Sequence, residues 1–161
     1  MNDEDKDKSK RYNRRDIAIY KPNSKKTGGV AQFKMSGASD CMFLECASQI
    51  GEMKSSNPYD WSNKILFKLG EPDICKMLAY FRLDKPSAEL KLFHQSPDGT
   101  SKGASLKYQE YGGKPSYYLS LTHQKSKGGT PNKVGLPIGL DEVEYLKVGF
   151  KKALEMILHW D

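Results

Sequence analysis

Short segments in which apolar and polar residues alternate follow one another from residue 17 onward. Alternation with period two, in runs rich in β-branched and aromatic residues and bounded by Gly, Pro, Asn or Ser, predicts β-strands. Four such strands are expected in the first half of the chain, at 17–20, 30–35, 41–47 and 64–69. A helix should follow, because Pro72 suits a first helical turn and apolar residues then recur at helical spacing as far as Phe81.

The second half of the chain repeats this order of elements. Its predicted strands lie at 88–93, 104–111, 116–123 and 133–138. A longer helix of about 20 residues is expected from Asp141, because Asp141 and Glu144 have the spacing of a capping box. Its apolar face runs from Val143 to Ile157.

Three pairs of segments can be aligned between the halves in the same order. "NKILFKLGEPDICKML" (63–78) aligns with "NKVGLPIGLDEVEYLK" (132–147), so that Gly70 falls on Gly139. "AQFKM" aligns with "ASLKY", and "CMFLECASQ" with "SYYLSLTHQ". Any two amphipathic strands can align by chance, but three ordered pairs favour duplication. We therefore predict an α+β fold with a ββββα unit written twice.

The alternation also divides the strand residues between two faces of each sheet. The apolar set should lie under the helices and comprises Ala31, Phe33, Met35, Met42, Leu44, Cys46, Leu90, Leu92, Ala104, Leu106, Tyr108, Tyr117, Leu119 and Leu121. The opposite set mixes cations, amides and hydroxyls with aromatic rings and comprises Tyr20, Gln32, Lys34, Phe43, Lys91, Phe93, Lys107, Gln109, Tyr111, Tyr118, Ser120, Thr122 and Gln124.

Rings interleaved with cations on an open sheet have the chemistry needed to hold single-stranded nucleic acid. Unpaired bases stack on aromatic faces, and lysines neutralise the backbone. The alternative is that these rings pack beneath loops or against another subunit. Neither helix carries the basic face that reading a major groove requires. Trp61 is a further stacking candidate or, alternatively, a lid on the core.

Two loops add to the positive charge. Residues 21–29 and 124–133 each combine lysines with Gly-Gly, so ammonium groups and backbone amides could approach phosphates together, although an ordinary hairpin connection would have the same composition. Their candidate lysines are Lys25, Lys26, Lys125 and Lys127.

Composition agrees with a polyanionic partner. The chain has 161 residues, a net charge of +6 and a pI near 9.1. Residues 1–16 are charged and are expected to form a flexible tail, followed by a single domain, 17–161, made of repeats 17–84 and 86–161. The absence of an apolar run of about 20 residues predicts no membrane span. The start shows no targeting peptide, so we expect a cytoplasmic or nucleoid-associated protein.

No pattern predicts catalysis, a metal site or a cofactor. The three histidines, His94, His123 and His159, form no HExxH and have no ligand spacing with the three cysteines. Acidic residues are scattered rather than paired at strand ends. We expect a protein that is not an enzyme and binds no metal or cofactor.

The double ββββα order and the C-terminal sequence "ALEMILHWD" (153–161) resemble the Whirly single-stranded DNA-binding family. Kinetoplastid guide-RNA-binding proteins share that fold, and single-repeat PC4-type coactivators are related to it. The resemblance spans 17–161 and implies two antiparallel four-stranded sheets around a helical core, tetramers formed through the helices, and little sequence preference. The KGKAA motif of the plant members is not evident, since the nearest stretch, 28–38, has Lys34 displaced. A bacterial, archaeal or viral setting is therefore expected.

The resulting hypothesis is a single-stranded DNA-binding protein that serves replication, repair or transcription. An RNA-binding protein of the same fold is the first alternative, because stacking tolerates either sugar. The second is an oligomeric protein–protein interaction module. In each case we expect a homo-oligomer, a dimer or tetramer, formed through the C-terminal helix, whose apolar residues Val148, Phe150, Leu154, Ile157, Leu158 and Trp160 exceed what one sheet covers.

Overall fold

The computed structural model describes residues 15–160. The first repeat is an antiparallel four-stranded sheet in chain order. Its strands are β1 (Ile17–Lys21), β2 (Gly29–Met35), β3 (Met42–Ser48) and β4 (Ile65–Leu69). A short 3-10 helix, η1 (Trp61–Asn63), precedes β4, and helix α2 (Glu71–Phe81) follows it.

The second repeat has the same topology and longer strands. These are β5 (Leu90–Gln95), β6 (Ser101–Tyr111), β7 (Lys114–Gln124) and β8 (Asn132–Gly139), followed by α3 (Leu140–Leu158). The predicted α+β fold with two ββββα repeats is confirmed. Strand β6 begins three residues before its predicted start, and β7 extends beyond its prediction at both ends. Gly112 and Gly113, both at positive φ, close the two strands into one long hairpin with a two-residue turn, so β7 begins directly after the turn at Lys114.

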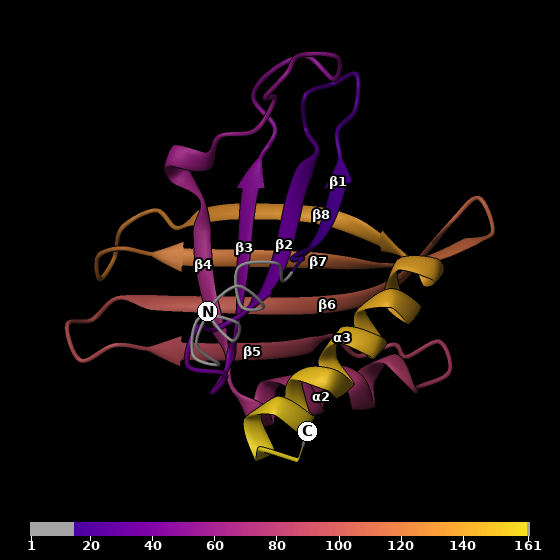
Figure 1. Cartoon of the computed structure of the whole chain (residues 1–161). Helices are drawn as coiled ribbons and strands as arrows, with labels where there is room; N and C mark the ends of the chain where they lie inside the picture. Colours follow the sequence, from indigo (N-terminus) through magenta and orange to yellow (C-terminus); the bar gives the residue numbers. More distant parts are fainter. Residues whose placement is uncertain (1–14, 161) are drawn as a thin grey trace, which may run out of the picture.

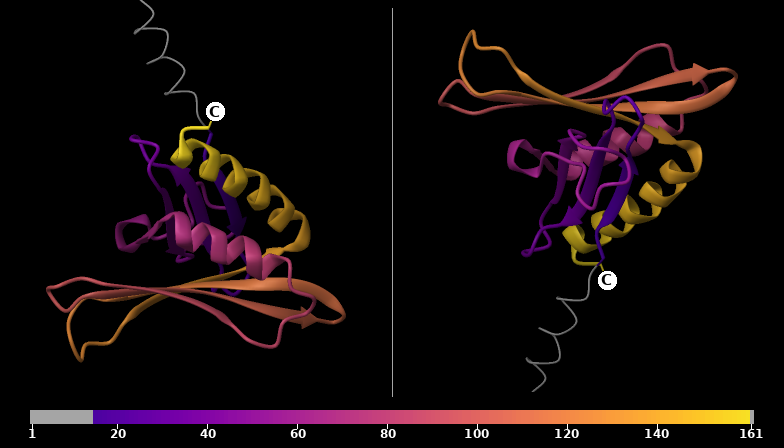
Figure 2. Two further views of the ribbon diagram at one scale, coloured as in Figure 1. Left: turned by 90° about the horizontal axis from the view of Figure 1, so that it is seen from below. Right: turned by 90° about the horizontal axis from the view of Figure 1, so that it is seen from above.

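The strands of the two sheets run across one another, vertically for β1–β4 and horizontally for β5–β8 in Figure 1. Figure 2 shows the first sheet and both helices on one side of the second sheet. No other element of residues 15–160 covers the opposite face of the second sheet in these views. This arrangement gives the second sheet one face buried in the core and one face directed to solvent.

One hydrophobic core joins the two repeats. It contains the inward residues of both sheets together with Ile74 and Met77 of α2 and Val143, Leu146 and Phe150 of α3. The predicted apolar set all lies in this core or packs against it. Phe150 is completely buried in this core. The prediction that it forms part of the apolar surface through which α3 oligomerises is therefore wrong.

Both helices begin in the same way. The N–H of Gly70 donates to the Asp73 carboxylate at 3.1 Å, and the N–H of Gly139 donates to Glu142 at 2.9 Å. The prediction that Asp141 caps α3 is therefore wrong, because β8 runs straight into the helix and Gly139 occupies the cap position. Glu142 also accepts from Lys21 of β1 at 2.6 Å.

The predicted tail, 1–16, lies outside the described residues except for Arg15 and Asp16, which are exposed. Within residues 15–160, no helix is both long enough and apolar enough to pass through a bilayer.

Candidate nucleic-acid interface

Strand register places a lysine opposite a ring on the outer face of the second sheet. Lys107 of β6 pairs across from Tyr118 of β7, which itself pairs with Pro137 of β8. Next to them lies a row of small residues, Ser105, Ser120 and Gly135. A Cβ at Gly135 would collide with the Tyr118 ring, so this glycine lets the ring lie close to the sheet.

Two hollows adjoin each other on this face, and Lys107 and Tyr118 line both. The first has a volume of about 530 Å³, and its rim includes Lys91, Phe93 and Lys133. Its shape follows from the small residues beneath it, which are Gly103, Ala104, Ser105, Ser120 and Thr122. The second, of about 670 Å³, is lined by Lys107, Gln109, Tyr111, Lys114, Ser116, Tyr118 and Pro137.

The rings beside these hollows are accessible. Phe93 is 65% exposed, Tyr111 74% and Tyr118 37%. With strands about 4.8 Å apart and residues about 3.4 Å apart along them, Phe93 and Tyr118 lie roughly 16 Å from each other. They are therefore two separate stacking platforms rather than two walls of a single slot.

The charge on this face is predominantly positive, although Glu89, directly before β5, also lines the first hollow. The outward positions of β5–β8 carry Lys91, Lys107, Lys114 and Lys133 and no Asp or Glu. None of these four lysines makes an ion pair within residues 15–160. Their ammonium groups thus remain available for an anionic ligand.

The first sheet repeats the lysine–ring pair but adds an acid. Lys34 of β2 lies opposite Phe43 of β3. Beside them, Glu45 is 6% exposed and its Oε1 accepts from Lys34 at 2.7 Å and Lys64 at 3.3 Å. Burial alone raises the pKa of Glu45, but the hydrogen bonds and charges of the two lysines outweigh it and hold the pKa below its ordinary value. Lys34 is consequently neutralised in part.

The connection between β3 and β4 covers part of the same outer face. Tyr59 and Trp61 pack on Val30 and Ala47, which point outward from the sheet yet are fully buried. The expectation of an open outer face is wrong for this region. Trp61 acts as the predicted lid, over a small satellite cluster rather than the main core. A hollow of about 660 Å³ remains beside Tyr20, Tyr59 and Trp61.

The loop between β1 and β2 is internally bonded. The backbone N–H groups of Asn23 and Gly28 both donate to the buried side chain of Gln49, at 2.8 and 3.2 Å. These two amides are therefore used by the protein itself. Lys26 pairs with Glu52 at 2.9 Å, while Lys25 is exposed.

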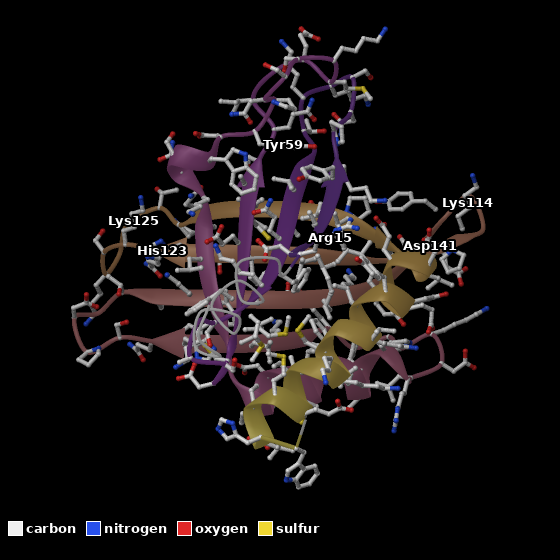
Figure 3. All side chains as sticks on the ribbon, viewed as in Figure 1. Arg15, Tyr59, Lys114, His123, Lys125 and Asp141 are labelled. Carbon is white, nitrogen blue, oxygen red and sulfur yellow. The ribbon has the colours of Figure 1, made fainter. Side chains whose placement is uncertain are left out.

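The loop between β7 and β8 lies at the opposite end of the long hairpin from Lys114, and Figure 3 shows Lys125 and His123 together there. Lys125 and Lys127 are exposed. His123, Lys125 and Asn132 line a hollow of about 400 Å³, to which Asp60 of the first repeat also contributes. Burial, followed by the charges of Lys102 and Lys125, lowers the pKa of His123, so the ring is neutral at physiological pH.

The structure leaves none of the fifteen candidate residues in the interior. Those that are exposed are Tyr20, Lys25, Lys26, Lys91, Phe93, Lys107, Tyr111, Tyr118, Lys125 and Lys127. Those that are half-buried are Gln32, Lys34, Phe43, Gln109 and Thr122. The second sheet brings seven of them onto one face, namely Lys91, Phe93, Lys107, Gln109, Tyr111, Tyr118 and Thr122.

Sequence reasoning missed four residues that shape these surfaces. Lys114 and Lys133 line the hollows of the second sheet, and Glu45 and Tyr59 line that of the first. The signal for Lys114 and Glu45 was the period-two alternation itself, since each lies two residues from an outward position. Among residues 15–160, no three His, Cys, Asp or Glu side chains gather as a metal site would require.

This fold matches a known family along most of the chain. The family model described as Whirly transcription factor matches residues 16–148. The chain belongs to the Whirly family. Whirly proteins are known for nucleic-acid binding, which agrees with the cationic, ring-bearing face of the second sheet.

Several solved structures share the fold at low sequence identity. WHY3 from Arabidopsis thaliana is 18% identical, with a TM-score of 0.68 over 91% of this chain and 90% of that chain. The plant transcriptional regulator PBF-2 is 17% identical, with a TM-score of 0.67 over 91% and 83%. MRP1/MRP2 of Trypanosoma brucei is 11% identical, with a TM-score of 0.64 over 96% and 94%. No curated protein matches the sequence.

Proposed function

We propose that this Whirly protein binds single-stranded DNA on the outer face of its second sheet, with little sequence specificity on that face, in replication, repair or transcription. The observation that carries the proposal is that lysines without an ion-pair partner lie beside exposed aromatic rings around two adjoining hollows. A single strand offers both a charged backbone and free base faces, and this surface has a partner for each.

A single strand fits this face better than a duplex does. Stacking on Phe93 or Tyr118 requires a base whose face is free, and a duplex buries that face against neighbouring pairs. The hollows lie on a sheet, and the exposed face of α3 carries Lys152 beside Glu155, at 3.3 Å, rather than a cationic surface. Both observations favour unpaired nucleic acid.

A salt titration with labelled oligo-dT tests the proposal. Affinity should fall steeply with salt, because each neutralised phosphate of a single strand contributes about −0.7 to the slope of log K against log salt. Oligo-U in parallel tests the RNA alternative, since a preference for it would require contacts to the 2′-hydroxyl. No binding of either oligonucleotide at low salt would contradict the proposal and favour a protein–protein interaction module.

We also propose that the protein forms a homo-oligomer through α3. On this helix Tyr145 is 52% exposed and Val148 68%, and Trp160 beyond its end is 77% exposed. A second copy of the chain would bury these apolar groups. Sedimentation of the protein and of Val148→Asp tests this: the wild type should sediment as a dimer or tetramer and the variant as a smaller species. A wild-type protein that is only monomeric at micromolar concentration would contradict it.

A further inference from the structure

The hollow on the first sheet differs in kind from the two on the second. Tyr20 and Trp61 line it, and both rings contact Tyr59, with centroids 6.0 and 6.4 Å away. The same hollow is lined by Gln32, Glu45 and Lys64. Aromatic walls therefore meet a charged, hydrogen-bonding edge, which is the combination that distinguishes reading a base from merely stacking on one.

The Tyr59 hydroxyl is an unexplained polar group at this place. Tyr59 is 7% exposed, and within residues 15–160 its hydroxyl is the one buried side-chain polar atom without a hydrogen-bond partner. Burial, followed by the nearby Tyr20 hydroxyl, raises the pKa of Tyr59, so the group stays protonated and able to donate. Such a group is costly in a folded protein unless a ligand or water satisfies it. Figure 3 places Tyr59 at the upper end of the first sheet, above β2 and β3.

The polar edge has a definite pattern of donors and acceptors. Lys34 and Lys64 both bind Oε1 of Glu45, so neither lysine occupies Oε2 of this ionised, nearly buried carboxylate. Gln32 lies directly opposite Glu45 in the strand register, and its side-chain amide has no partner within residues 15–160. Lys64 adds an ammonium donor beside the carboxylate.

Guanine matches this pattern better than the other bases do. Its N1–H and N2–H₂ groups lie side by side and both donate, as a carboxylate requires, while its O6 accepts from an ammonium group. Adenine and cytosine each present one amino group next to an acceptor nitrogen. Thymine presents two carbonyl oxygens around a single N–H, and one of these would face the carboxylate. We propose that the hollow between Tyr20, Tyr59 and Trp61 holds one unpaired guanine, whose edge is read by Glu45 and Lys64.

This inference rests on the proposed function, to which it adds a base-specific subsite on the other sheet. The test compares the binding of oligo-dT with that of the same oligonucleotide carrying one central guanine, adenine or cytosine, measured by fluorescence anisotropy on the full chain. The guanine oligonucleotide should bind about tenfold more tightly than oligo-dT, the size of effect that one paired base contact gives. Adenine and cytosine should fall between them.

Two variants and a control locate the subsite. Glu45→Gln should abolish the guanine preference and leave oligo-dT binding as tight or tighter. Tyr59→Phe should reduce the preference about threefold while the protein melts no lower than the wild type, because it removes an unpaired buried hydroxyl. Glu110→Gln removes an equal charge from an exposed site outside the hollow and should keep the full preference.

The outcomes separate the two proposals. Equal affinity for all four oligonucleotides, a preference for thymine, a guanine preference that survives in Glu45→Gln, or an undiminished guanine preference in a folded Tyr59→Phe would overturn the guanine subsite. Binding of oligo-dT to the second sheet would stand in each of those cases. Failure of every oligonucleotide to bind would overturn the proposed function and the subsite with it.

Discussion

The outer faces of the two sheets carry the same lysine–ring pair but differ in the residue beside it. Lys34 lies opposite Phe43 in the first sheet, as Lys107 lies opposite Tyr118 in the second. In the aligned segments "CMFLECASQ" and "SYYLSLTHQ", Glu45 of the first sheet corresponds to Ser120 of the second. One acid thus decides whether the lysine is paired within the protein or left for a ligand.

The connections between the third and fourth strands of each repeat differ as well. In the first repeat this connection returns over the sheet, and Tyr59 packs on Val30 and Ala47. In the second repeat the corresponding loop carries Lys125 and Lys127 at the end of the hairpin and leaves the face uncovered. The duplicated unit has therefore kept its fold, while one copy presents a covered, partly neutralised face and the other an open, cationic face.

Removing an aromatic ring should have the largest effect on oligo-dT affinity, and the loss should differ most between the two faces. Tyr118→Ala removes a stacking platform that lines both hollows and should weaken oligo-dT binding by about 1 to 3 kcal/mol. Phe43→Ala should cost much less, because that ring is half-buried and does not line the hollow of the first sheet or either hollow of the second. Anisotropy titrations of both variants measure the difference. Equal losses would remove the distinction between the faces.

Transferring the acid from one sheet to the other should have the next largest effect. Ser120→Glu places a carboxylate beside Lys107, as Glu45 lies beside Lys34, and should weaken oligo-dT binding about tenfold while reducing its salt dependence. Ser120→Gln is the matched control for side-chain volume and should bind nearly as the wild type does. If both variants lose binding equally, bulk rather than charge is responsible.

Removing one lysine from each face should have a smaller effect on oligo-dT affinity, which is measured by its dependence on salt concentration. Lys107→Ala should lower the slope of log K against log salt by about 0.7, the share of one phosphate on a single strand. Lys34→Ala should change the slope less, because Lys34 is already paired with Glu45 at 2.7 Å. A larger change for Lys34→Ala than for Lys107→Ala would reverse the roles assigned to the two sheets.

The smallest expected effect is on stability, through the pKa of Glu45. Because that pKa is lowered in the folded protein, its ion pairs contribute stability above the ordinary glutamate pKa near 4.5, and the contribution disappears as pH falls through the folded value. Glu45→Gln should therefore lower the free energy of unfolding by about 1 kcal/mol at neutral pH, a figure reduced by the exposure of the two lysines. Denaturant titrations at pH 7 and below pH 4 should show the difference shrinking with acid.

Most of the fold could be predicted from the sequence because its signals are local. Period-two alternation located every strand, and the alignment of Gly70 with Gly139 anticipated that both helices begin at an equivalent glycine. The same alternation assigned side chains to faces, so Tyr118 and Lys107 lie outward as expected. The helix cap assigned to Asp141 failed because a strand that continues directly into a helix moves the cap to the glycine between them.

The covering of the first sheet could not be predicted in the same way. Tyr59 reaches Val30 through a contact between segments far apart in the chain, and no periodicity encodes it. A trace of it was present, since Val30 and Ala47 are apolar at positions that alternate with polar outward residues. The pairing of Glu45 with Lys34 and Lys64 likewise depends on the register of three neighbouring strands.

Photo-crosslinking tests the central claim most directly. Oligo-dT substituted with 5-iodouracil forms covalent links to aromatic side chains on which its bases stack, and mass spectrometry then identifies them. The account predicts crosslinks to Tyr118 and Phe93 on the outer face of the second sheet. Crosslinks confined to Tyr145 and Trp160, with none on β5–β7, would contradict it.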